Sequence, residues 1–315
     1  MKKKEIFNND FLPIKQKELF LYDQYFKLFA KLFKNNLLPS KILLTGQSGL
    51  GKSTFAYHFI NFILSDREDY SYDSKNFTIN SLNRSFHLIN QKYHPNFFLI
   101  QNLDDKQIID IKQVKNMISF ANKTSFEKKI KFILIDNAEY LNLSSVNALL
   151  KIVEETPSNT FIIFVHNSSI KLIETLKSRC IEFKIFFSNQ EKEIILKNLL
   201  TYHDLKIDLN LLEKIKSYHD SPGAILILVK LINEGIIDMN NPNLTNIISN
   251  LMEFILKNKN NTNLNLLQNA IELFFFQELK KSNNKNKISL TYSEVLKSLN
   301  LLKKYNIDMN NTFYE

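Results

Sequence analysis

Residues 41–54 read KILLTGQSGLGKST, and this stretch decides the fold. It opens with an apolar run of strand length, and Gly46–Ser53 then fits the pattern G-x-x-x-x-G-K-[ST]. An apolar-periodic helix is expected from Lys52 to about residue 64. Glycines permit positive φ, so consecutive backbone N–H groups can turn inward and form an anion-binding nest. Because the helix points its partially positive N-terminus at the same place, the sequence predicts a phosphate site there.

The residue types in this loop match the chemistry of a nucleotide with Mg²⁺. Lys52 reaches the β- and γ-phosphates, and the Ser53 hydroxyl takes one position on the metal. Asp136 ends a second buried strand, and we expect it to hold Mg²⁺ through water because the two strands should lie side by side. The alternatives are a structural turn that only looks like a phosphate loop, and an Asp136 that merely caps a turn.

The residue after Asp136 is Asn137. In hydrolysing ATPases of this general kind a glutamate at that position polarises the attacking water, whereas asparagine carries no charge and cannot act as a general base. Glu139 is two residues further on and is expected to point elsewhere. The sequence therefore predicts a pocket that binds nucleotide better than it splits it.

Composition excludes several other classes. A chain of 315 residues suggests two or three domains, and a hydrophobic fraction of 44% excludes a disordered chain. A single cysteine excludes an internal disulfide and a Cys₄ or Cys₂His₂ zinc site. No apolar run approaches the roughly 20 residues that span a bilayer, and no secretory signal is visible. We therefore expect a cytoplasmic protein without a membrane partner.

Strand and helix patterns alternate up to residue 187, which indicates an α/β fold with a parallel sheet covered on both faces. The expected strands are 41–45, 97–100, 131–135, 160–165 and 181–187. The expected helices are 23–33 with Asp23 as cap, 52–64, 108–121, 144–155 with Ser144 or Ser145 as cap, and 172–177. Residues 66–93 are polar and irregular. A capping box of Ser188 and Glu191 then opens a helical region.

Only helices are expected after residue 188. They cover 188–200, 208–218 and 222–233 and, beyond a linker at 240–243, 244–257, 262–281 and 289–304. The sequence thus divides into a nucleotide-binding domain at 1–187, a small helical lid domain at 188–238, and a helical C-terminal domain at 239–315.

Further motifs resemble a known family. In order they are His94-Pro95-Asn96, KFILIDNAE at 131–139, SVNALLKIVEETP at 145–157, FIIFVHN at 161–167, Ser178-Arg179-Cys180 and Ser221-Pro222-Gly223-Ala224. Over about residues 36–235 the chain resembles the bacterial clamp-loader branch of the AAA+ ATPases, and most of all the delta-prime subunits of DNA polymerase III. The resemblance implies a P-loop AAA+ domain, a helical lid, and an all-α C-terminal collar that serves oligomerisation.

The resemblance also implies site residues. Arg179 would project into the ATP site of a neighbouring subunit as an arginine finger in trans; arginine is always charged and its planar fork matches phosphate oxygens. The alternative is a surface arginine in a salt bridge. Sensor 1 would be Asn167, with His166 as the second choice. The predicted nucleotide-binding residues are Gly46, Gly49, Gly51, Lys52, Ser53, Thr54, Asp136 and Asn167, with Ser53 and Asp136 on the Mg²⁺ of ATP.

Two departures bear on activity. Active motors of the family carry a lid arginine where this chain has Gly223, and no arginine follows Arg179. Many members hold a zinc module where residues 66–93 contain no cysteine, so no zinc is expected. The C-terminal domain also looks short for a collar.

We therefore interpret the chain as a non-motor clamp-loader subunit in DNA replication. It would bind ATP weakly or structurally and act with gamma/tau-like and delta-like subunits, a sliding clamp and primed DNA. Little intrinsic ATPase is expected, and any polymerase activity belongs to the whole DNA polymerase III assembly. One alternative is a gamma/tau-like ATP-hydrolysing motor. Another is a small-molecule phosphotransferase, which the three arginines of the sequence disfavour. A third is a DNA-binding protein, which the formal charge of +9 supports but the spread of the lysines along the chain disfavours.

Overall fold

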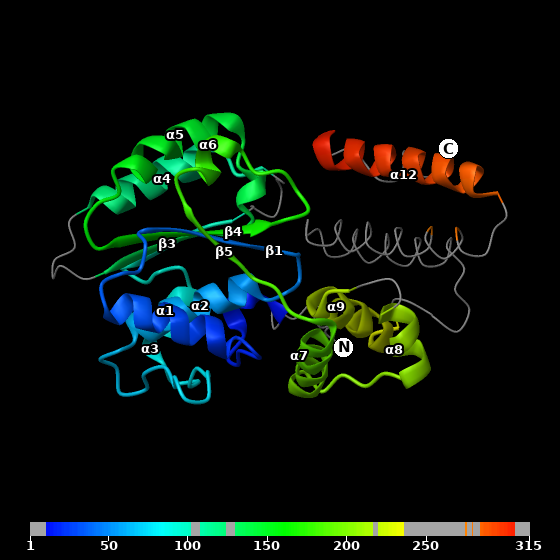
Figure 1. The fold of residues 1–315 in the computed structure, drawn as a ribbon, viewed down its shortest axis with the longest axis horizontal. Helices are drawn as coiled ribbons and strands as arrows, with labels where there is room; N and C mark the ends of the chain where they lie inside the picture. The colour runs from blue at the N-terminus through cyan, green and yellow to red at the C-terminus, as the bar shows by residue number, and fades with distance from the viewer. Residues whose placement is uncertain are drawn as a thin grey trace, which may run out of the picture.

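Five parallel strands form the centre of the protein in the order β2-β3-β4-β1-β5 (Figure 1). This computed structural model describes residues 11–101, 108–123, 130–216, 220–235 and 284–305, together with positions 275 and 279. The strands are β1 Lys41–Gly46, β2 Phe97–Ile100, β3 Lys131–Ile135, β4 Thr160–Asn167 and β5 Ile181–Lys184. The predicted α/β fold is confirmed, although β5 ends three residues earlier than expected.

The strand order corrects one expectation. β1 and β3 are not neighbours, because β4 pairs with both of them. The two strand ends that carry the phosphate loop and Asp136 are therefore one strand further apart than predicted. Even so, both lie at the carboxyl edge of the sheet, where ligands of open α/β folds bind.

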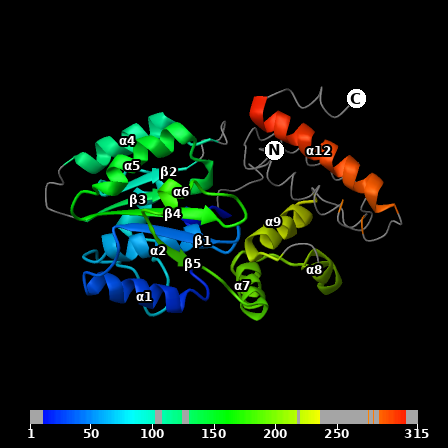
Figure 2. The same ribbon diagram turned by 45° about the horizontal axis from the view of Figure 1, so that its top comes forward.

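Helices cover both faces of the sheet (Figures 1 and 2). One face carries α1 Asp23–Lys34, α2 Lys52–Leu64 and α3 Arg84–Asn90. The other carries α4 Ile111–Asn122, α5 Leu143–Glu154 and α6 Glu174–Lys177. Each face has its own apolar core, which explains why the strands read as continuous apolar runs rather than as alternating ones.

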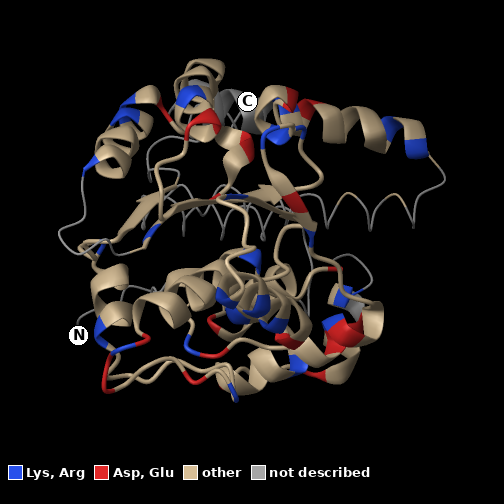
Figure 3. Cartoon of the chain, turned by 60° about the vertical axis from the view of Figure 1, so that its left-hand side comes forward, with Lys and Arg blue, Asp and Glu red and all other residues tan. Residues whose placement is uncertain are grey.

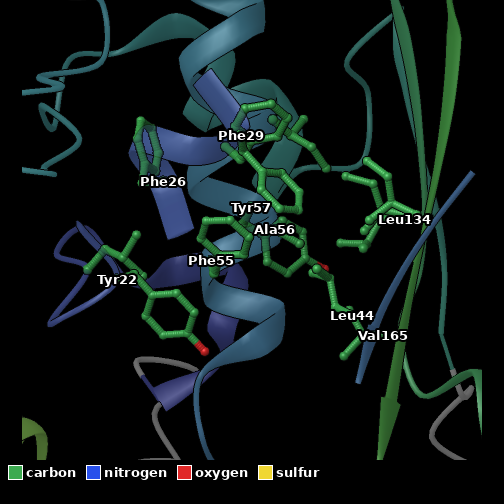
Figure 4. Packing of buried hydrophobic residues seen from close by; sticks show 14 of the residues in the cluster. Tyr22, Phe26, Phe29, Leu44, Phe55, Ala56, Tyr57, Leu134 and Val165 are labelled. Carbon is green, nitrogen blue, oxygen red and sulfur yellow. The ribbon is translucent and has the colours of Figure 1, made fainter. Parts of the chain in front are cut away.

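The core under the phosphate loop is rich in aromatic side chains (Figure 4). Phe29 packs edge-on against Phe55 with ring centroids 5.1 Å apart, and Tyr22 stacks on Phe55 at 5.0 Å. The buried Tyr22 hydroxyl donates a hydrogen bond to the Leu50 carbonyl at 3.0 Å. This contact fixes the phosphate loop to the core from beneath.

Residues 66–93 are held by a hydrogen-bonded polar cluster. The buried Ser85 hydroxyl donates to a Glu68 carboxylate oxygen at 2.6 Å and lies 3.2 Å from Nε2 of His94. Asn83 caps α3 by accepting from the Phe86 N–H. The prediction missed α3, since this helix has only seven residues and depends on hydrogen bonds of Asn83 and Ser85 to Asn61 and Glu68 outside it.

Two predicted helix caps are wrong. The N-cap of α1 is Tyr22, with Asp23 as the first helical residue, and α5 begins after Asn142, whose side chain accepts from the Ser145 N–H. Among the described residues, no helix is long and apolar enough to cross a membrane.

Three helices follow the sheet: α7 Asn189–Tyr202, α8 Leu209–Lys216 and α9 Pro222–Asn233. The predicted capping box of Ser188 and Glu191 is present at α7. Phe11 stacks on His203, and the Lys230 ammonium lies 4.0 Å from the Phe11 ring centroid, so the N-terminal segment packs on these helices. Further along, α12 spans Lys285–Tyr305. The helix predicted at 244–257, and nearly all of the one at 262–281, lie outside the described residues.

Candidate functional site

The glycines of the loop have the backbone and the space that a phosphate nest needs. Gly49 and Gly51 have φ of +78° and +88°, in the left-handed region that favours glycine. A Cβ on Gly46 would lie 2.5 Å from the Ile185 carbonyl oxygen. The backbone N–H groups of residues 48–54 donate to no other described residue, so they are available to an anion.

Lys52 is buried at the start of α2. Its ammonium donates to the carbonyl oxygens of Gly46 at 2.8 Å and Gln47 at 2.6 Å. Burial lowers the pKa of Lys52 to about 8, while the nearby charges of Glu139 and Asp136 oppose the shift. Lys52 is therefore a cation held inside the loop by weak carbonyl acceptors, and a phosphate group would be a much stronger partner.

Ser53, in the first turn of α2, and Asp136, which follows β3, come together even though β1 and β3 are not adjacent. The Ser53 hydroxyl donates to Oδ1 of Asp136 at 2.7 Å. Burial raises the pKa of the Asp136 carboxyl, and the hydrogen bond from Ser53 opposes that shift. A hydroxyl and a carboxylate are oxygen ligands, and this pair fits an ion such as Mg²⁺, which usually takes one or two protein ligands and completes its shell with phosphates and water.

Glu139 does not point away from the site, so that expectation is wrong. Asn137 has a left-handed backbone with φ of +59°, and the 3₁₀ turn Ala138–Tyr140 follows it. This turn brings the Glu139 carboxylate to the end of β4, where it accepts from the Asn167 backbone N–H at 3.2 Å. Burial raises the pKa of Glu139, and the charge of Lys52 opposes the shift, so the two groups share one electrostatic environment.

The two sensor candidates end β4 beside the loop, because Gly46 pairs with Asn167 and Thr45 pairs with His166. The Asn167 side-chain oxygen accepts from the Ser169 N–H at 3.1 Å, which leaves its amide N–H groups as donors. Nε2 of His166 lies 2.8 Å from the Ile170 carbonyl, and its buried Nδ1 has no hydrogen-bond partner among the described residues. Both side chains thus lie at the end of β4 next to the end of β1.

Helix α9 contacts the loop directly. The Gly223 N–H donates to the Gly49 carbonyl at 2.9 Å. A Cβ on Gly223 would lie 2.8 Å from that oxygen, and a Cβ on Gly49 would lie 2.5 Å from the Ser221 hydroxyl. The helical region therefore packs on the phosphate loop through two positions that only glycine fits.

Replacing Gly223 with alanine tests this packing. We expect a loss of about 1–3 kcal/mol in the free energy of unfolding, because the new Cβ pushes against backbone rather than against a flexible side chain. Urea unfolding measures the loss, and amide hydrogen exchange should show lost protection at position 223. Gly235→Ala is the control for backbone strain without a clash, since φ is +71° there and nothing lies within 4 Å of that Cβ, and it should leave the protection at Gly223 intact. Unchanged exchange in Gly223→Ala would contradict the prediction.

Arg179 lies between α6 and β5 with its side chain 35% exposed. Its Nε and Nη2 donate to one Glu154 carboxylate oxygen at 2.8 Å and 2.7 Å, and its Nη1 donates to the Thr175 carbonyl at 2.8 Å. Arg179 thus forms an ion pair with α5, and none of these partners is a hydrogen-bond partner of Lys52.

The fold and the loop define a P-loop AAA+ domain followed by a helical lid, since the strand order, the phosphate loop at the end of β1 and the helices packed on that loop occur together. The sequence profile of the family described as "DNA polymerase III, delta subunit" matches residues 22–188, which is more than half of the chain. The chain belongs to this family, and it is a member of the DNA polymerase III clamp-loader group.

Individual relatives agree with this family. The chain is 27% identical over 140 residues to the DNA polymerase III subunit delta' of Pseudomonas aeruginosa, covering 44% of this chain and 41% of the relative. It is 26% identical over 159 residues to the subunit delta' of Buchnera aphidicola subsp. Baizongia pistaciae, covering 49% and 46%. It is 24% identical over 241 residues to the subunit gamma/tau of Mycoplasma genitalium, covering 69% and 38%. The matches span about half the length of the delta' relatives.

Proposed function

We propose that this chain is a delta-prime-like clamp-loader subunit that binds ATP with Mg²⁺ and donates Arg179 to the ATPase site of a neighbouring subunit. The main support for the proposal is that one site combines residues suited to binding phosphate with a residue unsuited to hydrolysis. The phosphate-binding half is complete in Lys52, Ser53 and Asp136, whereas Asn137 stands where a hydrolysing relative needs a glutamate. Such a site holds nucleotide and turns it over slowly.

In this role the bound nucleotide would stabilise the subunit rather than be hydrolysed by it. The loop N–H groups and the ammonium of Lys52 would bind the phosphates, Ser53 and Asp136 would hold Mg²⁺, and Asn167 or His166 would contact the phosphate end from β4. The Lys52 ammonium donates to neutral carbonyl oxygens, and bound ATP would give it an anionic partner. The nucleotide would thereby stiffen the joint between the sheet and the lid.

Arg179 suits action on a neighbour. Its ion pair with Glu154 is solvent-exposed, with the Glu154 side chain 52% exposed, and exposed pairs of this kind contribute little stability. Breaking this ion pair so that the Arg179 guanidinium can bind a neighbour's phosphates would therefore cost little free energy. The proposed partners are gamma/tau-like and delta-like subunits, a sliding clamp and primed DNA. Basic and acidic residues both occur along the described helices and loops (Figure 3), and we propose that DNA contact is made through the assembly.

A second candidate is a gamma/tau-like motor, and one observation favours it. Glu139 places a half-buried carboxylate close enough to Lys52 to oppose the effect of burial, which lowers the pKa of Lys52. The site therefore contains a carboxylate even though residue 137 is an asparagine. Measuring ATP turnover by the isolated wild-type chain separates the two candidates. Turnover at motor rates that Glu139→Gln abolishes would support the motor, whereas slow turnover unaffected by that substitution supports the non-motor subunit.

Substitutions at Asn137 give a further prediction. Because φ is +59° there, Asn137→Glu is expected to lower the free energy of unfolding by about 1 kcal/mol, while Asn137→Gly keeps it. We also expect ATP turnover to stay low in Asn137→Glu, since the strained backbone does not hold the new carboxylate in place. Urea unfolding and a phosphate-release assay measure both effects. Motor-rate turnover in Asn137→Glu would show that a single missing carboxylate limits the site.

Reconstitution tests the proposed function as a whole. The wild-type chain is mixed with gamma/tau and delta subunits, clamp and primed DNA, and clamp loading is followed with and without it. Loading that needs this chain supports the proposal. Equal loading in its absence contradicts it.

A further inference from the structure

Lys192 brings a second ammonium group to the phosphate loop. It lies in the first turn of α7, and its Nζ is 3.4 Å from Oε1 of Gln47 and 2.6 Å from Oδ2 of Asp220. Gln47 is also the residue whose backbone carbonyl accepts from Lys52 at 2.6 Å. Two lysines from different domains therefore converge on one residue of the loop.

The position of Lys192 is unfavourable for the helix that carries it. A cation in the first turn opposes the helix dipole, and Ser188 and Glu191 cap the same turn in the usual favourable way. The side chain is also withdrawn from water, with only 11% of it exposed. Lys192 thus opposes the helix dipole at the point where the lid meets the phosphate loop. Such a locally unfavourable residue indicates a functional position.

The partner that neutralises Lys192 is easily displaced. The Asp220 side chain is 62% exposed, so its ion pair with Lys192 is weakened by solvent. Phosphate oxygens carry more charge than one carboxylate and accept charge-assisted hydrogen bonds. The lid itself is held in place, because the Gly223 N–H donates to the Gly49 carbonyl.

We propose that the Lys192 ammonium exchanges Asp220 for the phosphate chain of the bound nucleotide, so that Lys52 and Lys192 clamp the phosphates from the sheet and from the lid. This inference rests on the proposed function, since it assumes that nucleotide occupies the loop. It assigns the lid's cation to α7 rather than to the start of α9, where Gly223 leaves no room for one.

Equilibrium binding of ATPγS with Mg²⁺ to the full chain tests the proposal. We expect Lys192→Ala to weaken binding roughly tenfold, which is the effect of losing one charge-assisted contact. Lys192→Arg should retain most of the affinity, because it keeps the charge. Lys197→Ala is the matched control, an exposed lysine on the same helix, and should leave affinity unchanged.

Asp220→Asn separates a phosphate contact from a structural ion pair. Both Lys192→Ala and Asp220→Asn break the ion pair, but only the first removes the cation. The proposal predicts opposite signs, with Asp220→Asn tightening ATPγS binding, whereas a purely structural pair predicts that both substitutions weaken it. Equal affinities of Lys192→Ala and Lys197→Ala, or weakening by Asp220→Asn, would overturn the inference and leave the proposed function standing. Failure of the folded wild-type chain to bind ATPγS would overturn the nucleotide part of the proposed function together with it.

Discussion

Arg179→Ala is expected to lower the ATPase rate of the assembled clamp loader by about three orders of magnitude, which is the lower end of the contribution of an arginine supplied in trans. Under the proposed function, the Arg179 guanidinium would stabilise charge on the transferring phosphoryl group of a neighbour's ATP. Steady-state ATPase with clamp and primed DNA measures the effect, and size-exclusion chromatography establishes that the subunits still assemble.

Two controls make this result specific to Arg179. Arg84→Ala removes an exposed arginine from α3 and should change nothing. Glu154→Gln releases the guanidinium without removing it, so the assembled rate should stay close to wild type. If the ATPase of the assembled loader is the same with Arg179→Ala as with Arg84→Ala, Arg179 is only a surface residue in a salt bridge.

Lys52→Met should weaken ATPγS binding by roughly 100-fold, which corresponds to about 3 kcal/mol. The methionine keeps the aliphatic stem in its buried position but removes the ammonium, so the loss reports the charge on the phosphates rather than packing. Isothermal titration of the full chain measures the dissociation constant. Binding within a few-fold of wild type would show that this loop does not hold phosphate.

Lys131→Met is the matched control for a buried lysine. The Lys131 ammonium donates to the carbonyl oxygens of Phe120 and Lys123 at the end of α4, and it lies 5.2 Å from the Phe120 ring centroid. Its removal leaves orphaned helix-end carbonyls, for which we expect a loss of about 1–3 kcal/mol in the free energy of unfolding. Nucleotide affinity should not change. Lys131→Met should therefore lower stability without lowering affinity, whereas Lys52→Met lowers affinity.

The strands were predictable because both sheet faces are covered, which makes each strand a short apolar run. The order of the strands was not, since β4 enters between β1 and β3 through contacts that no local pattern encodes. The cap of α5 was mispredicted for a different reason, which is local ambiguity. Asn142 is the side chain that caps α5, and three candidate caps stand within four residues of each other there.

The candidate site was predictable where chemistry depends on neighbours in the sequence. The glycines, Lys52 and Ser53 form one contiguous motif, and Asp136 follows a recognisable strand. Glu139 was misjudged because its direction depends on the left-handed backbone of Asn137. Lys192 carried no signal at all, because Gln47, the loop residue that it contacts, lies 145 positions away.

The close contact between Gly223 and Gly49 has a consequence for how this protein can evolve. An arginine at 223, where the family resemblance places one in motors, would begin with a Cβ 2.8 Å from the Gly49 carbonyl oxygen. A glutamate at 137 would begin in a left-handed backbone. Either substitution alone, the arginine at 223 or the glutamate at 137, is thus expected to destabilise the fold before the second one is present. For the non-motor subunit proposed above, regaining hydrolysis by single substitutions would therefore first lower the stability of the chain.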